Sequence, residues 1–94
     1  MDETNFPTAF TLSQNYPNPW NPQTTIRYSL PLAEFVTLTV YDAVGREVAL
    51  LVNEHRHAGY HEAVFRADGF ASGVYYYALR AGGFVQTRKL ILVR

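Results

Sequence analysis

The fold of this chain is decided by Gly73-Val74-Tyr75-Tyr76-Tyr77-Ala78-Leu79-Arg80, then Ala81-Gly82-Gly83, then the run Phe84–Val93. Valine and tyrosine favour strands, and a short glycine-containing turn joins two strands into a hairpin. Residues 74–80 are apolar on both faces, which predicts a central strand. We expect residues 84–93 to form the last strand, with the run Leu90-Ile91-Leu92-Val93 well buried.

Alternation of apolar and polar residues predicts two half-buried strands upstream, at residues 24–30 and 35–41. Their inward faces are expected to carry the larger apolar side chains: Ile26, Tyr28 and Leu30 in the first, and Val36, Leu38 and Val40 in the second. Pro31 ends the first of these strands because proline has no backbone N–H to donate.

Three further strands complete the prediction. We expect a short strand at residues 10–13, a return strand at 46–52 with Val48 and Leu50 in register, and a strand at 59–66. The inward residues of the last are expected to be His61, Ala63 and Phe65. Residues 53–58 are polar and are expected to form a loop. About seven strands with turns every 8–12 residues are typical of an all-β, immunoglobulin-like antiparallel β-sandwich.

The composition limits what the chain can do. Its 94 residues make one domain, with residues 1–9 as a linker or tail and residues 10–94 as the folded unit. Eight basic and eight acidic side chains cancel, so no nucleic-acid partner is expected. Without cysteine the chain has neither disulfides nor thiolate metal sites. Residues 1–9 do not resemble a signal peptide, so we expect any export signal to lie upstream in a longer parent protein.

A proline-rich segment precedes the first long strand: Asn15-Tyr16-Pro17-Asn18-Pro19-Trp20-Asn21-Pro22. Each proline removes a backbone donor and pushes its predecessor toward an extended conformation, which excludes a helix or a central strand. We expect an ordered turn or edge that fixes the start of the domain, with Tyr16 and Trp20 anchored in its body. The structural motif residues are Asn15, Tyr16, Pro17, Asn18 and Pro19, with the turn glycines Gly45 and Gly59.

The histidines are the first candidates for chemistry. His55, His57 and His61 would share one face of a strand, so a metal site completed by Glu54 or Glu62 is sterically possible. The spacing matches no established ligand signature. We therefore favour a solvated loop for His55 and His57 and a packed or capping role for His61.

Two aspartates precede glycine-containing turns, Asp42 and Asp68. Calcium ligation is one interpretation of such a site. Asx turns, in which the aspartate bonds its own backbone, are the favoured one. We expect neither a metal nor a cofactor in this chain.

No arrangement of residues supports catalysis. The serines lie in no nucleophile elbow, and no glycine-rich phosphate loop precedes a helix. Paired carboxylates would need a cleft, for which a domain of this size has little room. Tyr75 and Tyr77 share one strand face and Tyr76 lies on the other, which leaves a sugar-stacking platform open. Aromatic residues at this density more often fill a sandwich core.

The chain also resembles a known family, the carboxy-terminal sorting domains of the type IX (Por) secretion system. The resemblance covers about residues 10–94 in the family's order and spacing. It is carried by Gln14–Pro22, Thr25-Ile26, Tyr28, Leu30-Pro31, Val40-Tyr41-Asp42, Gly45-Arg46, Val48, Leu51, Ala58-Gly59-Tyr60-His61, Ala71-Ser72-Gly73-Val74-Tyr75-Tyr76 and Arg88-Lys89-Leu90-Ile91-Leu92-Val93-Arg94. The immunoglobulin-like domain of the flagellar hook-capping family is similar in its hairpin and in its Gly-Val-Tyr strand.

The resemblance implies a function. Such a domain ends a secreted protein of a Gram-negative bacterium, folds in the periplasm and is recognised by the outer-membrane type IX translocon. A sortase-like peptidase often cleaves it, and the cargo is attached to the cell surface. We therefore expect a monomeric, non-catalytic domain joined to the catalytic domain of a parent protein. Its expected localisation is secreted or outer-membrane cell surface, reached via the periplasm.

Recognition is expected near the end of the chain, and the candidate residues are Gly73, Tyr75, Lys89, Leu90, Ile91, Leu92, Val93 and Arg94. Two interpretations stay open. A partner could extend the last strand by strand addition, or Leu90 and Leu92 could be core while only the last few residues are read. The rival functions are a carbohydrate-binding accessory module of a secreted polysaccharide hydrolase, which needs an exposed line of aromatics, and a purely structural module.

Overall fold

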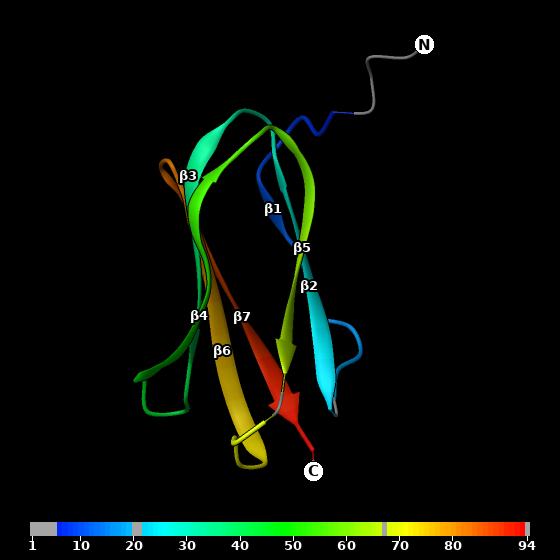
Figure 1. Ribbon diagram of the computed structural model, residues 1–94, viewed down its shortest axis with the longest axis vertical. Helices are drawn as coiled ribbons and strands as arrows, with labels where there is room; N and C mark the ends of the chain where they lie inside the picture. The colour runs from blue at the N-terminus through cyan, green and yellow to red at the C-terminus, as the bar shows by residue number, and fades with distance from the viewer. Residues whose placement is uncertain (1–5, 20–21, 67, 94) are drawn as a thin grey trace.

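Two antiparallel sheets pack face to face in the computed structural model, which describes residues 6–19, 22–66 and 68–93 (Figure 1). The smaller sheet has the strand order β1-β2-β5, formed by β1 (Thr11–Leu12), β2 (Gln23–Leu30) and β5 (Gly59–Arg66). The larger sheet has the order β4-β3-β6-β7, formed by β3 (Glu34–Tyr41), β4 (Glu47–Arg56), β6 (Gly73–Ala81) and β7 (Phe84–Leu92). The predicted all-β sandwich of about seven strands is confirmed.

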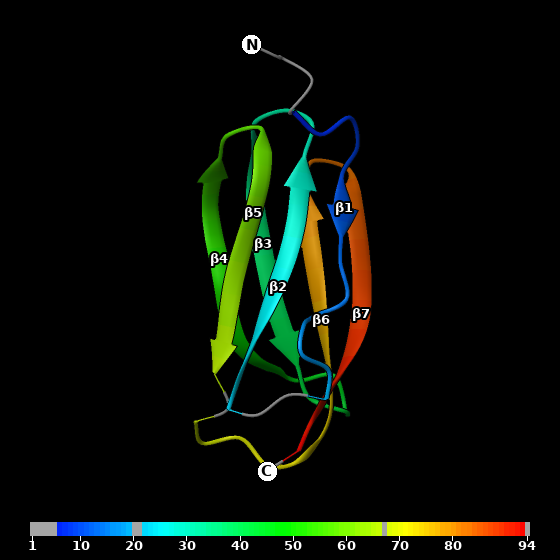
Figure 2. The same ribbon diagram turned by 90° about the vertical axis from the view of Figure 1, so that its right-hand side faces the viewer.

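The chain alternates between hairpins and crossings from one sheet to the other. β3 and β4 form one hairpin and β6 and β7 form another, whereas the chain changes sheet after β2, β4 and β5 (Figure 2). This connectivity is that of a Greek-key sandwich, as in immunoglobulin-like domains. No helix in the described part of the chain is long and apolar enough to cross a membrane.

The core lies between the sheets and uses the side chains that alternation assigned to the inward faces of β2, β3 and β5. The fully buried ones include Ile26, Leu30, Val36, Leu38 and Val40. On β5, Phe65 is buried and Ala63 and His61 are half-buried, whereas Tyr60 and Val64 are exposed. The face predictions for these three strands are therefore confirmed.

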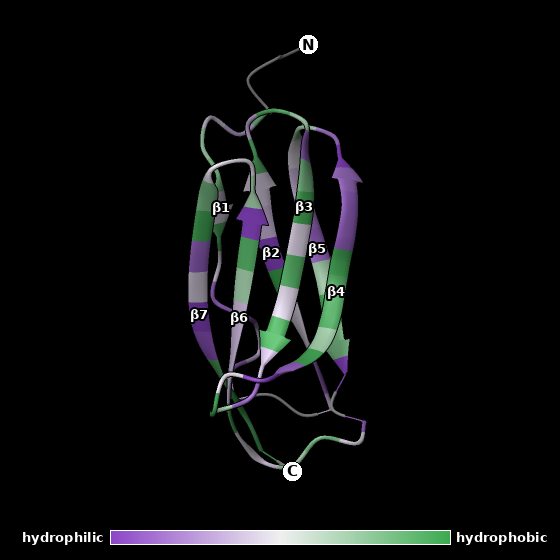
Figure 3. Cartoon of the chain, turned by 90° about the vertical axis from the view of Figure 1, so that its left-hand side faces the viewer, coloured by the Kyte–Doolittle hydropathy of each residue, from purple (hydrophilic) through white to green (hydrophobic). Residues whose placement is uncertain are grey.

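The last strand buries only every second residue. Leu90 and Leu92 are buried, Ile91 is half-buried and Val93 is 50% exposed. The expectation that the whole run is buried is wrong, because this sheet packs on the core with one face and leaves the other to solvent. Figure 3 shows the resulting bands of hydrophobic and hydrophilic residues along β6 and β7.

β4 is longer than predicted and its alternation is interrupted. Residues 53–56 continue the pairing with β3 up to Glu34 opposite Arg56, so the expected loop at 53–58 is wrong. The register shifts twice, between Leu38 and Thr39 and between Val40 and Tyr41. Such bulges turn the following side chains over. Leu50, expected in register with Val48, is accordingly 48% exposed.

Candidate functional site: the last strand and the segment beside it

β7 is held in place by its antiparallel pairing with β6. The turn Gly82-Gly83 joins the two strands. The register is unbroken from the pair Ala81 and Phe84 beside this turn to the pair Gly73 and Leu92 at the far end. Gly82 takes a φ of 58°, a left-handed conformation that glycine adopts without strain. Since β6 pairs with only one side of β7, the other side of β7 is an edge of the larger sheet.

Tyr75 secures the start of β6. Its side chain is buried, its hydroxyl donates to the Ala71 carbonyl at 2.7 Å, and its ring meets Phe70 edge-on. A tyrosine at this place that bonds backwards to the preceding crossover is the tyrosine corner of immunoglobulin-like sandwiches. Tyr75 is a candidate for recognition. In the structure it is buried and stabilises the start of β6, where it lies opposite Leu90 of β7.

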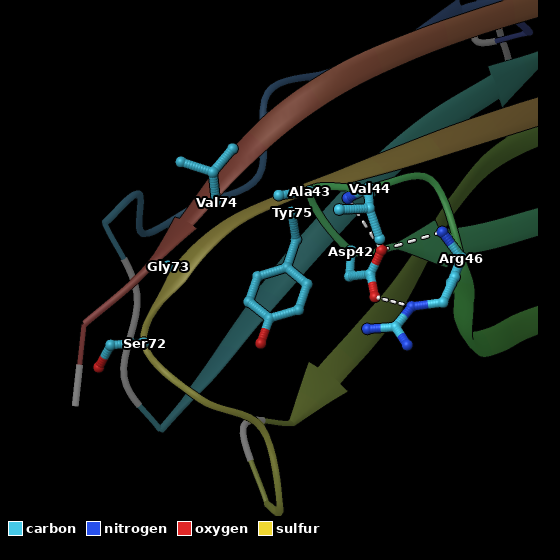
Figure 4. Close-up of a pocket in the computed structure, with 8 residues that line it drawn as sticks. All are labelled: Asp42, Ala43, Val44, Arg46, Ser72, Gly73, Val74 and Tyr75. Carbon is cyan, nitrogen blue, oxygen red and sulfur yellow. Dashed lines mark hydrogen bonds and ion pairs between the residues drawn. The ribbon is translucent and has the colours of Figure 1, made fainter.

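Gly73 and Tyr75 line a shallow pocket of about 250 Å³ at the end of the sandwich where β7 finishes (Figure 4). The rest of its lining comes from the β3–β4 turn and the start of β6: Asp42, Ala43, Val44, Arg46, Ser72 and Val74. Asp42 uses its carboxylate inside this turn. Its Oδ1 accepts from the N–H groups of Val44 at 3.1 Å and Arg46 at 2.9 Å, and its Oδ2 accepts from Arg46 Nε at 2.8 Å.

This geometry confirms the Asx turn predicted at Asp42. The hydrogen bond from the Arg46 backbone N–H, helped by the Arg46 guanidinium and the Val44 N–H, holds the pKa of the Asp42 carboxyl below its ordinary value. Asp42 and Arg46 form an ion pair within the turn, so this side of the pocket carries no net charge. Asp68, the second aspartate considered for calcium, is exposed and lies 3.6 Å from Arg66 Nε.

The Asp42 turn makes a pH-dependent contribution to stability. Because the pKa is lower in the folded state, this contribution is present above the unfolded-state pKa and is lost as the pH falls through the folded-state value. Asp42→Asn is expected to lower the melting temperature at neutral pH, and the gap to the parent chain should close in acid. Thermal melts between about pH 7 and pH 3 measure this. Asp68→Asn is the matched control, and an equal pH-dependent gap in the two variants would contradict the assignment.

The proline-rich segment is fastened to β2 by a buried amide. Asn15 is 2% exposed, and its Nδ2 donates to the Pro17 carbonyl at 3.1 Å and to Thr24 Oγ1 at 3.0 Å. Tyr16 exchanges two backbone hydrogen bonds with Thr25, each 2.9 Å long. The peptide bonds before Pro17 and Pro19 are cis.

Among the described residues of this segment, the anchor is therefore Asn15 and not the ring of Tyr16. The Tyr16 side chain is 73% exposed, so the expectation that it is anchored in the body is wrong. The Thr24 hydroxyl also donates to the Pro17 carbonyl at 2.9 Å, so the Asn15 amide completes a small network of buried polar groups. Trp20, the other expected anchor, lies outside the described residues.

The same segment runs beside the edge of β7, in the direction of that strand (Figure 2). We call residues Gln14–Asn18 the clasp. At one end Gln14 Nε2 donates to the Lys89 carbonyl at 2.6 Å, and at the other the Ile91 N–H donates to Asn18 Oδ1 at 3.0 Å. Two side-chain amides thus satisfy backbone groups on the edge of β7.

Two side chains of the larger sheet reach across the sandwich to the chain just before the clasp. Arg88 Nε donates to the Leu12 carbonyl at 2.5 Å, and the Tyr77 hydroxyl donates to the Ser13 carbonyl at 2.6 Å. Tyr77 has no exposed surface, and burial raises the pKa of its hydroxyl to about 12. β6, β7 and the clasp therefore form one hydrogen-bonded unit.

Sequence reasoning missed Gln14, Tyr77 and Arg88 as members of this unit. The available signal was the density of prolines, because a proline has no N–H to donate and a segment rich in prolines depends more on its side chains for hydrogen bonds. That signal does not say which strand the amides meet.

The two glycines of the predicted structural motif lie at turns. Gly45 has a φ of 91° in the β3–β4 turn and Gly59 a φ of 143° at the start of β5, with open space around both.

The histidines separate into different environments. His55 lies on β4, exposed and edge-on to Phe35, so the expectation of a loop at this residue is wrong. His61 stacks on Tyr28 and its Nε2 lies 2.8 Å from the His57 carbonyl, which confirms the packed role predicted for it. In the described ranges, no group of three or more His, Cys, Asp or Glu residues could hold a metal ion.

The exposed tyrosines are spread over the molecule. Tyr75 and Tyr77 share one face of β6 and Tyr76 lies on the other, as predicted, and the shared face is the inward one. Tyr76 is 37% exposed on the larger sheet, Tyr60 is 70% exposed on the smaller sheet, and Tyr16 lies in the clasp. These three side chains do not share one face, in contrast to the line of aromatics that a sugar-binding module needs.

Comparison with protein families gives a match over residues 14–93 to a model described as the secretion system C-terminal sorting domain. Comparison with curated proteins and with solved structures gave no match. The match starts at Gln14, the first residue of the clasp, and ends at Val93, one residue beyond β7. Since it covers most of the chain, the protein belongs to the family of C-terminal sorting domains of the type IX secretion system.

Proposed function

We propose that this domain directs a secreted parent protein across the outer membrane and on to attachment at the cell surface. The observation that carries the proposal is the family match, which extends from the clasp through β7. Domains of this family act as sorting signals and are in general not catalytic. In this proposal residues 10–94 are the sorting unit, and residues 1–9 link it to the catalytic domain of the parent.

The exposed residues at the end of the chain are the part that a translocon reads. Lys89 and Val93 are exposed and Ile91 is half-buried, and Arg94 follows them in the sequence. The remaining recognition candidates hold β7 in position. Leu90 and Leu92 hold β7 on the core, while Tyr75 and Gly73 lie opposite them on β6.

The partners in this proposal are the outer-membrane type IX translocon and a sortase-like peptidase that removes the domain after transport. The route runs through the periplasm and ends with the parent secreted or held on the outer-membrane surface. A folded domain suits this route, because Leu90 and Leu92 are protected in the core while Lys89 stays exposed. The basic residues give the terminus a charge that an acidic partner can steer toward itself.

A secretion assay tests the proposal. Residues 1–94 are fused to the end of an exported fluorescent reporter in a bacterium with a working type IX system. We expect translocon-dependent delivery to the surface or medium, and a several-fold loss of delivery with Lys89→Ala plus Arg94→Ala. The matched control is Arg27→Ala plus Arg66→Ala, which removes two exposed cations from the smaller sheet.

The outcomes separate sorting from folding. Reporter fluorescence and resistance to protease establish that each fusion is folded in the periplasm. A folded parental fusion that stays in the periplasm contradicts the sorting role. Equal delivery by the two double variants contradicts the placement of the signal at Lys89 and Arg94 and leaves the sorting role to the other exposed residues.

A further inference from the structure

We propose that the outer edge of β7 at Lys89 and Ile91 is a docking edge for an extended acidic strand of a partner protein. The clasp covers this edge in the free domain and is displaced when the partner strand pairs with β7. That the partner is a component of the secretion machinery rests on the proposed function. The docking edge itself rests on the geometry of the described residues.

The pairing of β6 with β7 determines which backbone groups face the edge. A two-residue turn makes Ala81 and Phe84 a hydrogen-bonded pair, and such pairs alternate along an antiparallel ladder. Phe84 and every second residue after it therefore point their backbone groups at β6. The residues between them, which include Lys89 and Ile91, point theirs at the edge, as their bonds to Gln14 and Asn18 show.

The clasp imitates a neighbouring strand without being one. It runs in the direction of β7 (Figure 2), and hydrogen bonds join Gln14 to Lys89 and Asn18 to Ile91. In a parallel ladder one residue of the added strand donates to the first of two such groups and accepts from the second. Here a side-chain donor and a side-chain acceptor do the same. Pro17 and Pro19 have no N–H, so the clasp cannot extend this into a ladder.

The clasp is held by buried contacts on the side of β2 and by exposed hydrogen bonds on the side of β7. Toward β2 it is fixed by the buried Asn15 amide and by backbone bonds between Tyr16 and Thr25. Toward β7 its two hydrogen bonds come from exposed side chains. Exposed strand edges pair readily with other chains, and many proteins prevent this by covering the edge with a loop such as the clasp. A partner that offers a whole backbone strand forms more bonds with β7 than the clasp does.

The charge of β7 indicates the chemistry of the partner. The strand carries Arg88 and Lys89 and has no acidic residue. A second copy of β7 would place cations against cations, which disfavours a dimer through this edge. Acidic side chains on an added strand would instead meet Lys89 on the outer face, whereas Arg88 is turned inward to the Leu12 carbonyl.

The test uses the purified chain and a clasp variant, Gln14→Ala plus Asn18→Ala. The control variant, Gln23→Ala plus Asn53→Ala, removes two exposed amides from β2 and β4. The probe is a labelled peptide of about ten alternating threonine and glutamate residues, the length of a long strand. Two further peptides serve as comparisons, one with lysine in place of glutamate and one with proline in place of threonine.

We expect the clasp variant to bind the acidic peptide several-fold more tightly than the control variant does, as measured by fluorescence anisotropy. The lysine and proline peptides should bind neither the clasp variant nor the control variant. Amide exchange followed by NMR should show faster exchange of the Ile91 N–H in the clasp variant. An Asn18→Asp variant keeps an acceptor for this N–H and should retain its protection, whereas Asn18→Ala should lose it.

The inference is overturned if a folded clasp variant binds the acidic peptide no better than the control, or if the proline peptide binds equally well. Self-association of the clasp variant would also overturn it, in favour of a second copy as the occupant. If the double variant does not fold, Asn18→Ala alone is measured by the same assays. Peptide binding without secretion of the fusion would contradict the proposed function and leave the docking edge intact, and the reverse would contradict only the docking edge.

Discussion

Leu90→Ala is expected to lower the free energy of unfolding by about 2–5 kcal/mol. Leu90 has no exposed surface, belongs to the core cluster and lies opposite Tyr75 in the register of β6 and β7. Truncation removes apolar contacts and leaves a cavity that a close-packed sandwich fills only in part. A domain of this size has a total stability of roughly 5–15 kcal/mol, so the loss is a large share of it.

Urea denaturation followed by fluorescence measures this change, and Val93→Ala supplies the control. Val93 is 50% exposed, so its truncation should change the stability by less than about 0.5 kcal/mol. Similar midpoints for the two variants would contradict the placement of Leu90 in the core. A loss of secretion in Leu90→Ala is then a folding effect, whereas a loss in Lys89→Ala with unchanged stability is a recognition effect.

The sequence predicted the faces of β2, β3 and β5 because alternation is a local property. Ile26, Val36 and Phe65 are buried as expected, since each lies in a regular stretch in which one face meets the core and the other meets solvent. The all-β class followed from the same patterns. None of these predictions required knowledge of which strands are neighbours.

Predictions that depend on neighbours were the ones that failed. The bulges in β4 exist because of its pairing with β3, and they expose Leu50 although its spacing from Val48 suggested otherwise. The polar residues after Val52 stay in the strand because β3 satisfies their backbone groups. Ile91 and Val93 are apolar but lie on the face of the larger sheet that points away from the core, where Val93 is 50% exposed.

The candidate site shows the same division. Its candidate residues come from the two ends of the chain, and the sequence does not show that these ends lie side by side. The bonds from Gln14 to Lys89 and from Ile91 to Asn18 each join residues more than 70 positions apart. Such contacts follow from the fold as a whole. The tyrosine corner at Tyr75 likewise needs the crossover from β5 to be in place.

Strong alkali is expected to destabilise the domain through Tyr77. Burial raises the pKa of this hydroxyl to about 12 in the folded chain, from an ordinary value of 10.0. A group whose pKa is raised by folding contributes fully below its unfolded-state pKa and loses that contribution as the pH rises through the folded-state value. The free energy of unfolding should therefore fall between pH 10 and about pH 12, by about 2–3 kcal/mol in total.

Tyr77→Phe isolates this effect. Near pH 7 the variant should be less stable than the parent by about 1–3 kcal/mol, because the Ser13 carbonyl loses its donor. As the pH rises the two stability curves should converge, since ionisation of Tyr77 in the parent removes the same hydrogen bond. Urea titrations at several pH values, with Tyr60→Phe as an exposed control, measure the two slopes.

Burial also raises the pKa of Tyr28, so some alkaline slope should remain in Tyr77→Phe. The prediction concerns the difference between the two chains, and parallel curves would contradict it. Because Tyr77 ties β6 to the chain just before the clasp, its ionisation should also loosen the cover of β7. The Ile91 N–H should then lose protection in Tyr77→Phe near neutral pH without either clasp amide being changed, which links the core of the sandwich to the edge proposed for docking.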